Sequence, residues 1–340
     1  MAIAVAGIMG SLFLWHPSPA EPPTPSSVGA DVLADAVPDR TTATEGSPGA
    51  QAKPDLPKAS DFIHPSSGKY LGVSLPNGAA GLSAYNKKTR TPANLSLEFV
   101  DFGERPPVGH MRDAYEQHAL TVLNWQPMEA SIASIVAGDQ DAYISAFAAD
   151  LAQTGLPVGV VFASEFNTDW QPWGTQATSA EQYVAAWRRI HNLATAAGAT
   201  NVIWIWAPNV INPVRKTPLK PFWPGEKYVD WVGLAAYWTP NLQEDSWETL
   251  IVPTKKRIRT FTDLPIVITE TGVMQGPRKI EWIRAMFEGL ATDRDVLGMI
   301  YLHAGFAEGK RGEWKVTKNP EHLAAWRAGA KKIETVPVNK

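Results

Sequence analysis

Eight short runs of apolar, β-branched or aromatic residues recur along the chain from Lys69 onward. They begin roughly 25 to 40 residues apart, which is the length of a unit of one strand, one helix and their connections. Runs such as NVIWIW are apolar almost throughout, as is typical of parallel strands covered on both faces. Eight such units predict an α/β fold, specifically a (β/α)8 TIM barrel. The runs are YLGVSL (70–75), LSLEFVDF (95–102), ALTVLNW (119–125), PVGVVFAS (157–164), NVIWIW (201–206), VDWVGLAAY (229–237), PIVITE (265–270) and VLGMIYLH (296–303).

Segments with helical periodicity separate several of these runs. Ser179 is a favourable N-cap, and Gln182 three residues later completes a capping box. Apolar residues then recur on one face as far as Gly198, which predicts the end of the helix. The ranges 139–151, 281–290 and 321–330 follow similar patterns. The alternation of strand and helix is therefore that of a barrel.

A doubly wound open sheet is the competing architecture. Such a sheet usually carries a glycine-rich phosphate turn after its first strand. The corresponding segment here is LPNGAAG (75–81), which does not have the G-x-G-x-x-G order. The barrel is therefore the favoured interpretation.

Composition removes several classes of function. The chain has 340 residues and a net charge of -3, so no basic field exists to bind nucleic acid or an anionic membrane surface. It has no cysteine, which excludes disulfides, thiolate metal sites and cysteine nucleophiles. Its His residues are scattered without metal-ligand spacing, and no Gly-x-Ser-x-Gly is present. We therefore expect neither a metal nor another cofactor, and 14 tryptophans suggest an aromatic-lined site for an uncharged ligand.

The N-terminal 60 residues differ from the rest. Residues 2–15 form an apolar run without charge, shorter than the roughly 20 residues that span a bilayer. The run matches the apolar part of a signal peptide but lacks the preceding basic residues, so a short membrane anchor is the alternative. From Pro17 to Pro57 the chain is rich in Pro, Ala, Ser, Thr and Gly, and such a segment cannot bury enough surface to fold.

We accordingly predict three regions. These are a signal-like or anchoring segment at 1–16, a disordered Pro/Ala/Ser-rich linker at 17–60 and a catalytic barrel at 61–340. This organisation favours a secreted or envelope-associated protein that the N-terminal segment tethers to a membrane or cell wall. A monomer is expected.

Function in a barrel collects at the carboxyl ends of the strands. Two of the acidic residues at these ends stand out: Glu165 directly follows VGVVFAS, and Glu270 directly follows PIVIT. A carboxylate at the end of an apolar strand lowers the stability of the fold unless it is solvated, paired with another group or required for function. Glycoside hydrolysis uses such a pair, one as proton donor and the other as nucleophile. Tyr237, at the end of the sixth run, is positioned to donate to Glu270 or to act as a core tyrosine.

Several segments resemble glycoside hydrolase family 26. The fourth-strand segment SEFNTDWQPWG (164–174) resembles the family's His-Glu-Met-Asn-Gly motif with its following Trp and Pro-Trp. The likeness continues in order through EQYVAAWRRIHNL (181–193), NVIWIWAPN (201–209), FWPGEKYVDWVGLAAYW (222–238) and IVITETG (266–272). It implies that Glu165 is the acid/base and Glu270 the nucleophile of a retaining, endo-acting enzyme. Members of this family act on β-mannan, and some on mixed-linkage β-glucan or β-1,3-xylan.

This chain departs from that motif at three positions. Ser164 stands where the family has His, Phe166 replaces Met and Thr168 replaces Gly. The His position contacts sugar, so its replacement affects the choice of polysaccharide more than hydrolysis itself. Asn167 is retained and either bonds to sugar or holds the loop. His303 ends the eighth run and is either a sugar donor or a structural residue.

Trp170, Trp173, Trp206 and Trp238 are the candidate platforms for stacking sugar rings, whereas Trp204 and Trp231 are expected in the core. The chain is thus predicted to cleave internal β-linkages of a polysaccharide, with β-1,4-mannan the first candidate. A non-catalytic barrel that binds glycan is the alternative, with Ser164 and Thr168 as signs of lost activity. Fold alone does not exclude a third reaction type.

Overall fold

The computed structural model describes residues 56–211, 217–240, 246–309 and 312–338. The predicted segment 1–16 and almost all of the predicted linker lie outside these residues. Ala59 is already buried, so the last residues before the predicted boundary at 61 pack against the barrel. In the part that the structure describes, no helix is both long and apolar enough to cross a bilayer.

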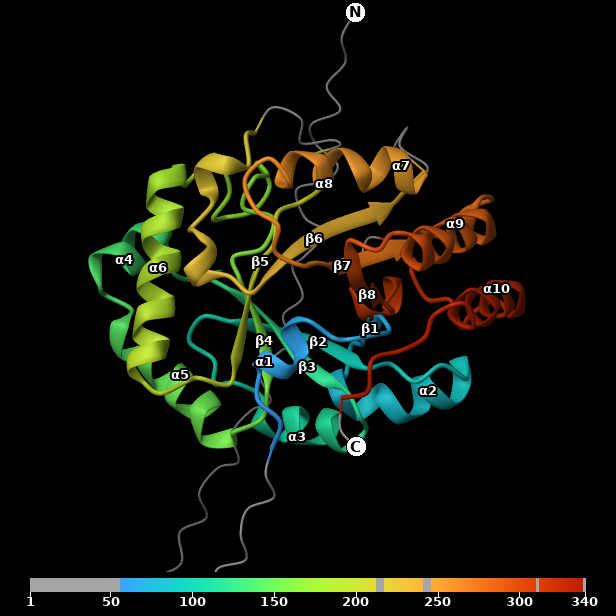
Figure 1. Ribbon diagram of the computed structural model, residues 1–340, viewed down its shortest axis with the longest axis horizontal. Coiled ribbons are helices and arrows are strands. Elements are labelled where there is room, and N and C mark those ends of the chain that lie inside the picture. Colours follow the sequence, from blue (N-terminus) through green and yellow to red (C-terminus); the bar gives the residue numbers. More distant parts are fainter. Residues whose placement is uncertain (1–55, 212–216, 241–245, 310–311, 339–340) are drawn as a thin grey trace, which may run out of the picture. The chain divides into compact units, whose positions relative to one another are not determined.

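Eight parallel strands close into a barrel in the order of the sequence, because β1 pairs with β8 as well as with β2 (Figure 1). The TIM barrel prediction is confirmed, and each predicted run contains most of one strand. The strands are β1 (Tyr70–Ser74), β2 (Leu95–Asp101), β3 (Leu120–Gln126), β4 (Val158–Phe162), β5 (Val202–Trp206), β6 (Trp231–Trp238), β7 (Ile266–Val273) and β8 (Val296–Leu302).

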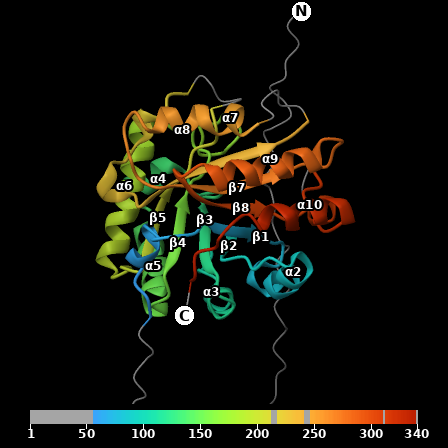
Figure 2. The ribbon, with the colours of Figure 1, turned by 45° about the vertical axis from the view of Figure 1, so that its right-hand side comes forward.

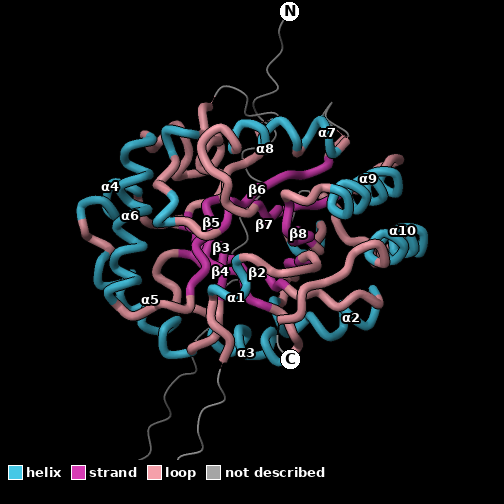
Figure 3. Tube along the Cα trace, viewed as in Figure 1, coloured by secondary structure: helices cyan, strands magenta, loops and turns pink. Residues whose placement is uncertain are grey.

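Helices surround this ring of strands (Figure 3). The predicted capping box at Ser179 and Gln182 is present and begins α6, and Gly155 ends α5 in the left-handed conformation. The helices are α1 (Ser60–Ile63), α2 (Leu82–Thr89), α3 (Val108–Glu116), α4 (Ile132–Ala137), α5 (Asp141–Thr154), α6 (Ala180–Ala196), α7 (Trp247–Leu250), α8 (Val252–Ile258), α9 (Lys279–Thr292) and α10 (Pro320–Ala330). Short 3-10 turns are η1 (Gly78–Gly81), η2 (Lys220–Phe222), η3 (Glu226–Tyr228) and η4 (Phe306–Glu308).

The strands alternate between two buried layers. In β5, Ile203 and Ile205 belong to the cluster inside the barrel, whereas Trp204 and Trp206 belong to the cluster beneath the helices. Burial on both faces explains why the strands are apolar almost throughout.

The amino ends of the strands are covered by the two ends of the described chain (Figure 2). The Tyr70 hydroxyl donates to the carbonyl of Phe62 (2.7 Å), and the Trp231 indole donates to the carbonyl of Ile63 (3.0 Å). From the other end of the chain, the carbonyl of Val336 accepts from the Asn94 amide (2.8 Å). This end of the barrel is therefore plugged, and access to its interior is left to the carboxyl ends.

Closure between β1 and β8 depends on a close approach at Gly298, which pairs with Tyr70. A methyl group at Gly298 would overlap the backbone of Tyr70. We predict that Gly298→Ala lowers the free energy of unfolding by roughly 1–3 kcal/mol through overpacking, measured by urea denaturation. Gly109, which is exposed on α3 with nothing near its added methyl, is the matched control. Gly109→Ala should instead raise stability by about 0.5–1 kcal/mol, and equal effects at the two positions would contradict this account of closure.

Candidate active site

Glu165 and Glu270 are both buried at the carboxyl-end half of the barrel, 2% and 4% exposed. Glu165 follows β4 by three residues. Glu270 does not end its strand as expected, because β7 continues to Val273. β7 pairs with β6 on one side and β8 on the other, and on both sides the register shifts next to Glu270, as at a β-bulge. Its side chain is thus carried by the rigid wall of the barrel and not by a loop.

The backbone that carries Glu165 is strained. Ala163 and Glu165 have φ values of 47° and 57°, in the left-handed region that side chains other than glycine rarely adopt. Backbone on either side holds this turn: the Ala163 amide donates to the carbonyl of Trp125 on β3 (3.1 Å), and the Glu165 amide donates to the carbonyl of Ala207, just after β5 (2.8 Å). Strain that persists at a buried acidic residue is typical of a functional site.

One amide links the two acidic positions. The Asn124 side chain, from β3, donates to a carboxylate oxygen of Glu270 (2.7 Å) and to the hydroxyl of Ser164 (3.1 Å). Ser164 immediately precedes Glu165, so a single buried side chain contacts both walls of the site. Among the described residues, the Asn124 amide oxygen accepts no hydrogen bond. This oxygen is therefore a buried acceptor left unsatisfied between the two acidic positions.

The carboxyl group of Glu165 has donors on both oxygens. Asn209 donates to Oε1, and Gln171 donates to Oε2 (2.8 Å). Burial nevertheless raises the pKa of Glu165, while the hydrogen bonds from Asn209, Gln171 and Trp170 act in the opposite direction. The environment thus favours the protonated acid yet also provides donors for the anion.

Tyr237 makes the contact that its sequence position predicts. Its hydroxyl donates to Oε2 of Glu270 (3.2 Å). Its pKa is raised far above the usual range by burial, then by the charge of Glu270 and by that of Glu165. Because the charges of both carboxylates raise the pKa of this one phenol, Glu165 and Glu270 both lie close enough to Tyr237 to interact with it electrostatically.

The prediction of four tryptophan platforms is largely wrong. Trp206 and Trp238 are 0% exposed in the layer beneath the helices, and Trp173 is 2% exposed with its indole donating to the carbonyl of Ser164 (2.7 Å). Alternation along each strand explains the outcome: in β6, Tyr237 faces the site and therefore its neighbour Trp238 faces away. Trp204 and Trp231 are in the core, as expected.

Trp170 remains at the site, since it is partly exposed and bonds to Glu165. Phe306 is another exposed aromatic residue, 66% exposed in η4, which follows β8. Phe306 lies beyond the apolar run 296–303, so its place in the sequence carries no signal of this exposure.

Asn167 and His303 have structural partners. The Asn167 side chain donates to the Asn209 carbonyl (2.9 Å) and accepts from the Asn209 amide (2.8 Å), so it holds the loop that carries Asn209. His303 is buried and its Nε2 bonds to the Thr317 hydroxyl (3.0 Å). Of the alternatives given for Asn167, the loop role is the one that these bonds support.

A wall behind Tyr237 was not anticipated either. Trp314 is fully buried and packs against the Tyr237 ring at 5.2 Å between centroids. The ammonium of Lys279, also fully buried, donates to the carbonyls of residues 313–315, with 2.9 Å to Trp314. This buried cation holds the segment after β8 against the site, and its burial lowers the pKa of Lys279 to about 8.

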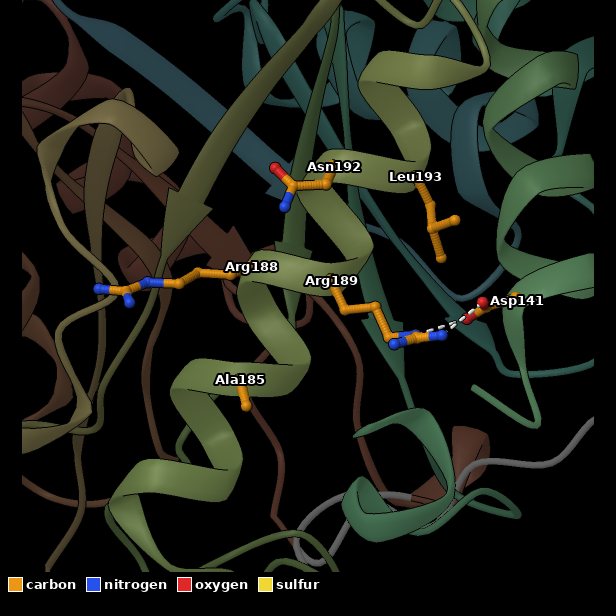
Figure 4. A pocket seen from close by; sticks show the side chains of 6 residues that line it. All are labelled: Asp141, Ala185, Arg188, Arg189, Asn192 and Leu193. Atoms are coloured by element: carbon orange, nitrogen blue, oxygen red, sulfur yellow. Dashed lines mark hydrogen bonds and ion pairs between the residues drawn. The ribbon is translucent and has the colours of Figure 1, made fainter. Parts of the chain in front are cut away.

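A depression of about 480 Å³ lies on the outside of the barrel, along α6 (Figure 4). Its two arginines point in opposite directions. Arg189 is paired with Asp141 (2.6 Å), and Arg188 donates to the Pro224 carbonyl (2.9 Å). The arginines thus belong to the outer helical layer. Within the described ranges, no cluster of His, Asp and Glu has the arrangement of a metal site.

Comparison with known proteins assigns the chain to a family. Residues 114–286 match the sequence model of glycosyl hydrolase family 26, and this range includes both Glu165 and Glu270. The chain belongs to glycosyl hydrolase family 26. The resemblance stated from the sequence motifs is therefore confirmed.

Curated relatives and solved structures agree with this assignment. Endoglucanase H of Acetivibrio thermocellus is 29% identical over 223 residues, covering 63% of this chain and 24% of that protein. A mannan endo-1,4-β-mannosidase of Bacillus subtilis is 28% identical over 130 residues, covering 36% of this chain and 32% of that protein. The family 26 β-mannanase of Bacteroides ovatus has the same fold, with a TM-score of 0.62, 17% identity, and coverage of 82% and 93% of the two chains. The chain thus spans less than half the length of each of these two curated relatives.

The effect of the Gln171 hydrogen bond on the pKa of Glu165 can be measured without a substrate. Removing the Gln171 donor should raise the pKa of Glu165, because its anion loses a hydrogen bond. We expect Gln171→Leu to shift the Glu165 titration to higher pH, measured by carbon NMR of labelled glutamate carboxyl groups. Gln176→Leu, at an exposed position of the same loop, is the control and should leave the titration in place. A Glu165 titration that Gln171→Leu leaves unchanged would contradict the assignment.

Proposed function

We propose that this barrel hydrolyses internal β-linkages of a polysaccharide with retention of configuration, using Glu165 as acid/base and Glu270 as nucleophile. The observation that carries the proposal is the Asn124 amide, which contacts both Glu270 and Ser164 and so links the two acidic positions. Retaining glycosidases need two carboxyl groups about 5–5.5 Å apart on either side of the scissile bond. Two contacts support such a spacing: the Asn124 amide bonds to both Glu270 and Ser164, and the charges of both acids raise the pKa of Tyr237.

The two environments suit opposite roles. Burial favours the protonated form of Glu165, which a proton donor requires. Glu270 receives hydrogen bonds from Asn124 and Tyr237, and donors of this kind favour the carboxylate that a nucleophile requires. Two acids with different surroundings are the usual basis for dividing acid and nucleophile roles.

The chemistry then follows in two steps. Glu165 donates its proton to the glycosidic oxygen while a Glu270 oxygen attacks the anomeric carbon, so the bond to the leaving sugar breaks and a glycosyl ester forms. Glu165 next removes a proton from water, the water oxygen attacks the same carbon, and Glu270 leaves as a carboxylate. Gln171, Asn209 and Trp170 stabilise the Glu165 anion between the two steps.

The substrate we propose first is a β-1,4-linked mannan. Support comes from the Bacillus subtilis relative, which is a mannan endo-1,4-β-mannosidase. A β-glucan is the second candidate, because Endoglucanase H aligns over more of this chain. Ser164 bears on this choice, since its hydroxyl is bonded to Asn124 and a histidine there would present a different group to the sugar. A β-1,3-xylan is a third candidate, since a β-1,3-xylanase of a Vibrio species is 22% identical over 237 residues.

We propose further that the chain acts outside the cytoplasm. The proposal rests on the apolar run at residues 2–15 and on the Pro- and Ala-rich segment that follows it. Fractionation of a host that expresses the full chain, probed with antibody to the barrel, tests it; a chain confined to the cytosol would contradict export.

Substitution of each acid tests the catalytic roles. Glu270→Gln should lower turnover of a responsive polysaccharide by roughly 10⁴-fold or more, because the nucleophile is lost. Glu165→Ala should lower it by roughly 10²- to 10⁴-fold but spare aryl glycosides, whose leaving groups need little protonation. Both are measured as kcat/KM after a screen of mannans, mixed-linkage glucan and xylans.

Glu288→Gln, at an exposed position of α9, is the matched control and should retain full activity. Circular dichroism and thermal unfolding check that each variant folds. Wild-type rates in both active-site variants would overturn the catalytic assignment. A wild-type chain that binds these polysaccharides without cleaving any would favour the non-catalytic barrel.

A further inference from the structure

Lys279 is a buried cation in an unfavourable position. It is the first residue of α9 and is 0% exposed. A positive charge is disfavoured at the amino end of a helix, where the backbone dipole is itself positive, and burial removes its solvation. Burial lowers the pKa of Lys279 to about 8, while the charge of Glu313 acts in the opposite direction. An apolar side chain would avoid both costs, so a lysine here indicates a role that an apolar residue cannot fill.

The ammonium group of Lys279 binds one short segment of backbone. Nζ donates to the carbonyls of Trp314 (2.9 Å), Lys315 (3.3 Å) and Glu313 (3.4 Å). It can do so because α9 packs along β7 and β8 (Figure 1), and residues 313–315 belong to the segment that follows β8. The Tyr301 hydroxyl, from β8, donates to the same carbonyl of Trp314 (2.8 Å). Two donors from different elements therefore fix the backbone of Trp314.

The side chain of Trp314 contacts the candidate active site. Its ring packs against the ring of Tyr237 at 5.2 Å between centroids. Both rings lie against Gly272, since a methyl group there would come within 2.8 Å of the Trp314 ring and 3.3 Å of the Tyr237 ring. The Tyr237 hydroxyl then donates to Oε2 of Glu270 (3.2 Å). A continuous series of contacts thus joins Lys279 to the carboxylate of Glu270.

We propose that Lys279 is a positioning residue for Glu270: its ammonium group fixes residues 313–315, and Trp314 in turn holds Tyr237 in hydrogen-bonding position to the nucleophile. The inference rests on the proposed function, in which Glu270 attacks the anomeric carbon. Lys279 acts through Trp314 and Tyr237 and takes no part in the chemistry itself. A misplacement of about 1 Å at a catalytic group can lower turnover by roughly 10²-fold, so a remote clamp of this kind affects the reaction.

Titration of Glu270 in the full chain, without substrate, tests the proposal. Lys279→Met keeps a side chain of similar length but removes the donors to residues 313–315. The hydrogen bond from Tyr237 should then weaken, and the Glu270 titration should move to higher pH because the anion loses a donor. Carbon NMR of labelled glutamate carboxyl groups measures the titration, and the Glu270→Gln variant identifies the resonance.

A double-mutant cycle with Tyr237→Phe separates positioning from a general loosening of the fold. If Lys279 acts through Tyr237, the two substitutions are coupled and their effects do not add. Lys279→Met should therefore cause no further shift of the Glu270 titration when Tyr237 is already Phe. Equal shifts in the two backgrounds, or no shift in either, would overturn the proposal.

Lys69 provides the matched control. It is also a partly buried lysine whose ammonium group donates to backbone carbonyls, those of Asp293 and Val296, but at the amino end of β8. Lys69→Met should leave the Glu270 titration in place even if it lowers the melting temperature. A shift as large as that of Lys279→Met would show that loss of any such lysine disturbs the site, and would contradict a specific role for Lys279.

Tyr301→Phe is the second variant, used if circular dichroism shows that Lys279→Met does not fold. It removes the other donor to the Trp314 carbonyl and keeps the ring. Because Lys279 is retained, we expect a smaller shift of the Glu270 titration in the same direction. A titration that Tyr301→Phe leaves unchanged would overturn the proposal.

Turnover distinguishes this proposal from the proposed function. On a responsive polysaccharide, Lys279→Met should lower kcat by roughly 10- to 100-fold with little change in KM, because the nucleophile is misplaced. Lys69→Met should keep the wild-type kcat. Should the wild-type chain hydrolyse no polysaccharide while Lys279→Met still shifts the Glu270 titration, the proposed function fails and the positioning of Glu270 stands. Should hydrolysis occur without that shift, the positioning proposal fails alone.

Discussion

Two carboxyl groups buried within reach of one tyrosine are the constraint on which this site depends. Burial penalises a charged carboxylate, and two neighbouring negative charges penalise each other. The chain meets this cost with amides and a phenol in fixed positions: Asn124 and Tyr237 at Glu270, and Asn209 and Gln171 at Glu165. None of these donors carries a charge, and burial raises the pKa of Glu165 while its hydrogen bonds act in the opposite direction.

The barrel supplies the rigidity that such an arrangement requires. Asn124 and Tyr237 lie within strands, and Glu270 lies within a strand paired on both sides. The exception is Glu165, which stands on a strained turn whose backbone is bonded to Trp125 on β3 and to Ala207 just after β5. Closure of the sheet at Gly298 and a plug at the amino ends leave the carboxyl-end rim as the functional face.

Much of the fold was predictable from the sequence, because a repeating strand–helix alternation admits few architectures. The carboxylates Glu165 and Glu270 and the donor Tyr237 were predictable for the same reason, since charged or polar residues near the ends of apolar strands mark the rim. The positions of the tryptophan side chains were not predictable, because a strand that is apolar almost throughout does not show which residues face the barrel interior. Trp206 and Trp238 face the helices. Asn124 was overlooked within an apolar run, although a polar residue there was the available signal.

The most direct test of the carboxylate pair is the configuration of the first product, followed by proton NMR during hydrolysis of a responsive β-linked polysaccharide. A nucleophilic Glu270 next to an acidic Glu165 requires two inversions at the anomeric carbon, so the new reducing end should appear first as the β-anomer and mutarotate only later. Initial release of the α-anomer would mean that water attacks directly, and that the two acids stand too far apart for the mechanism described.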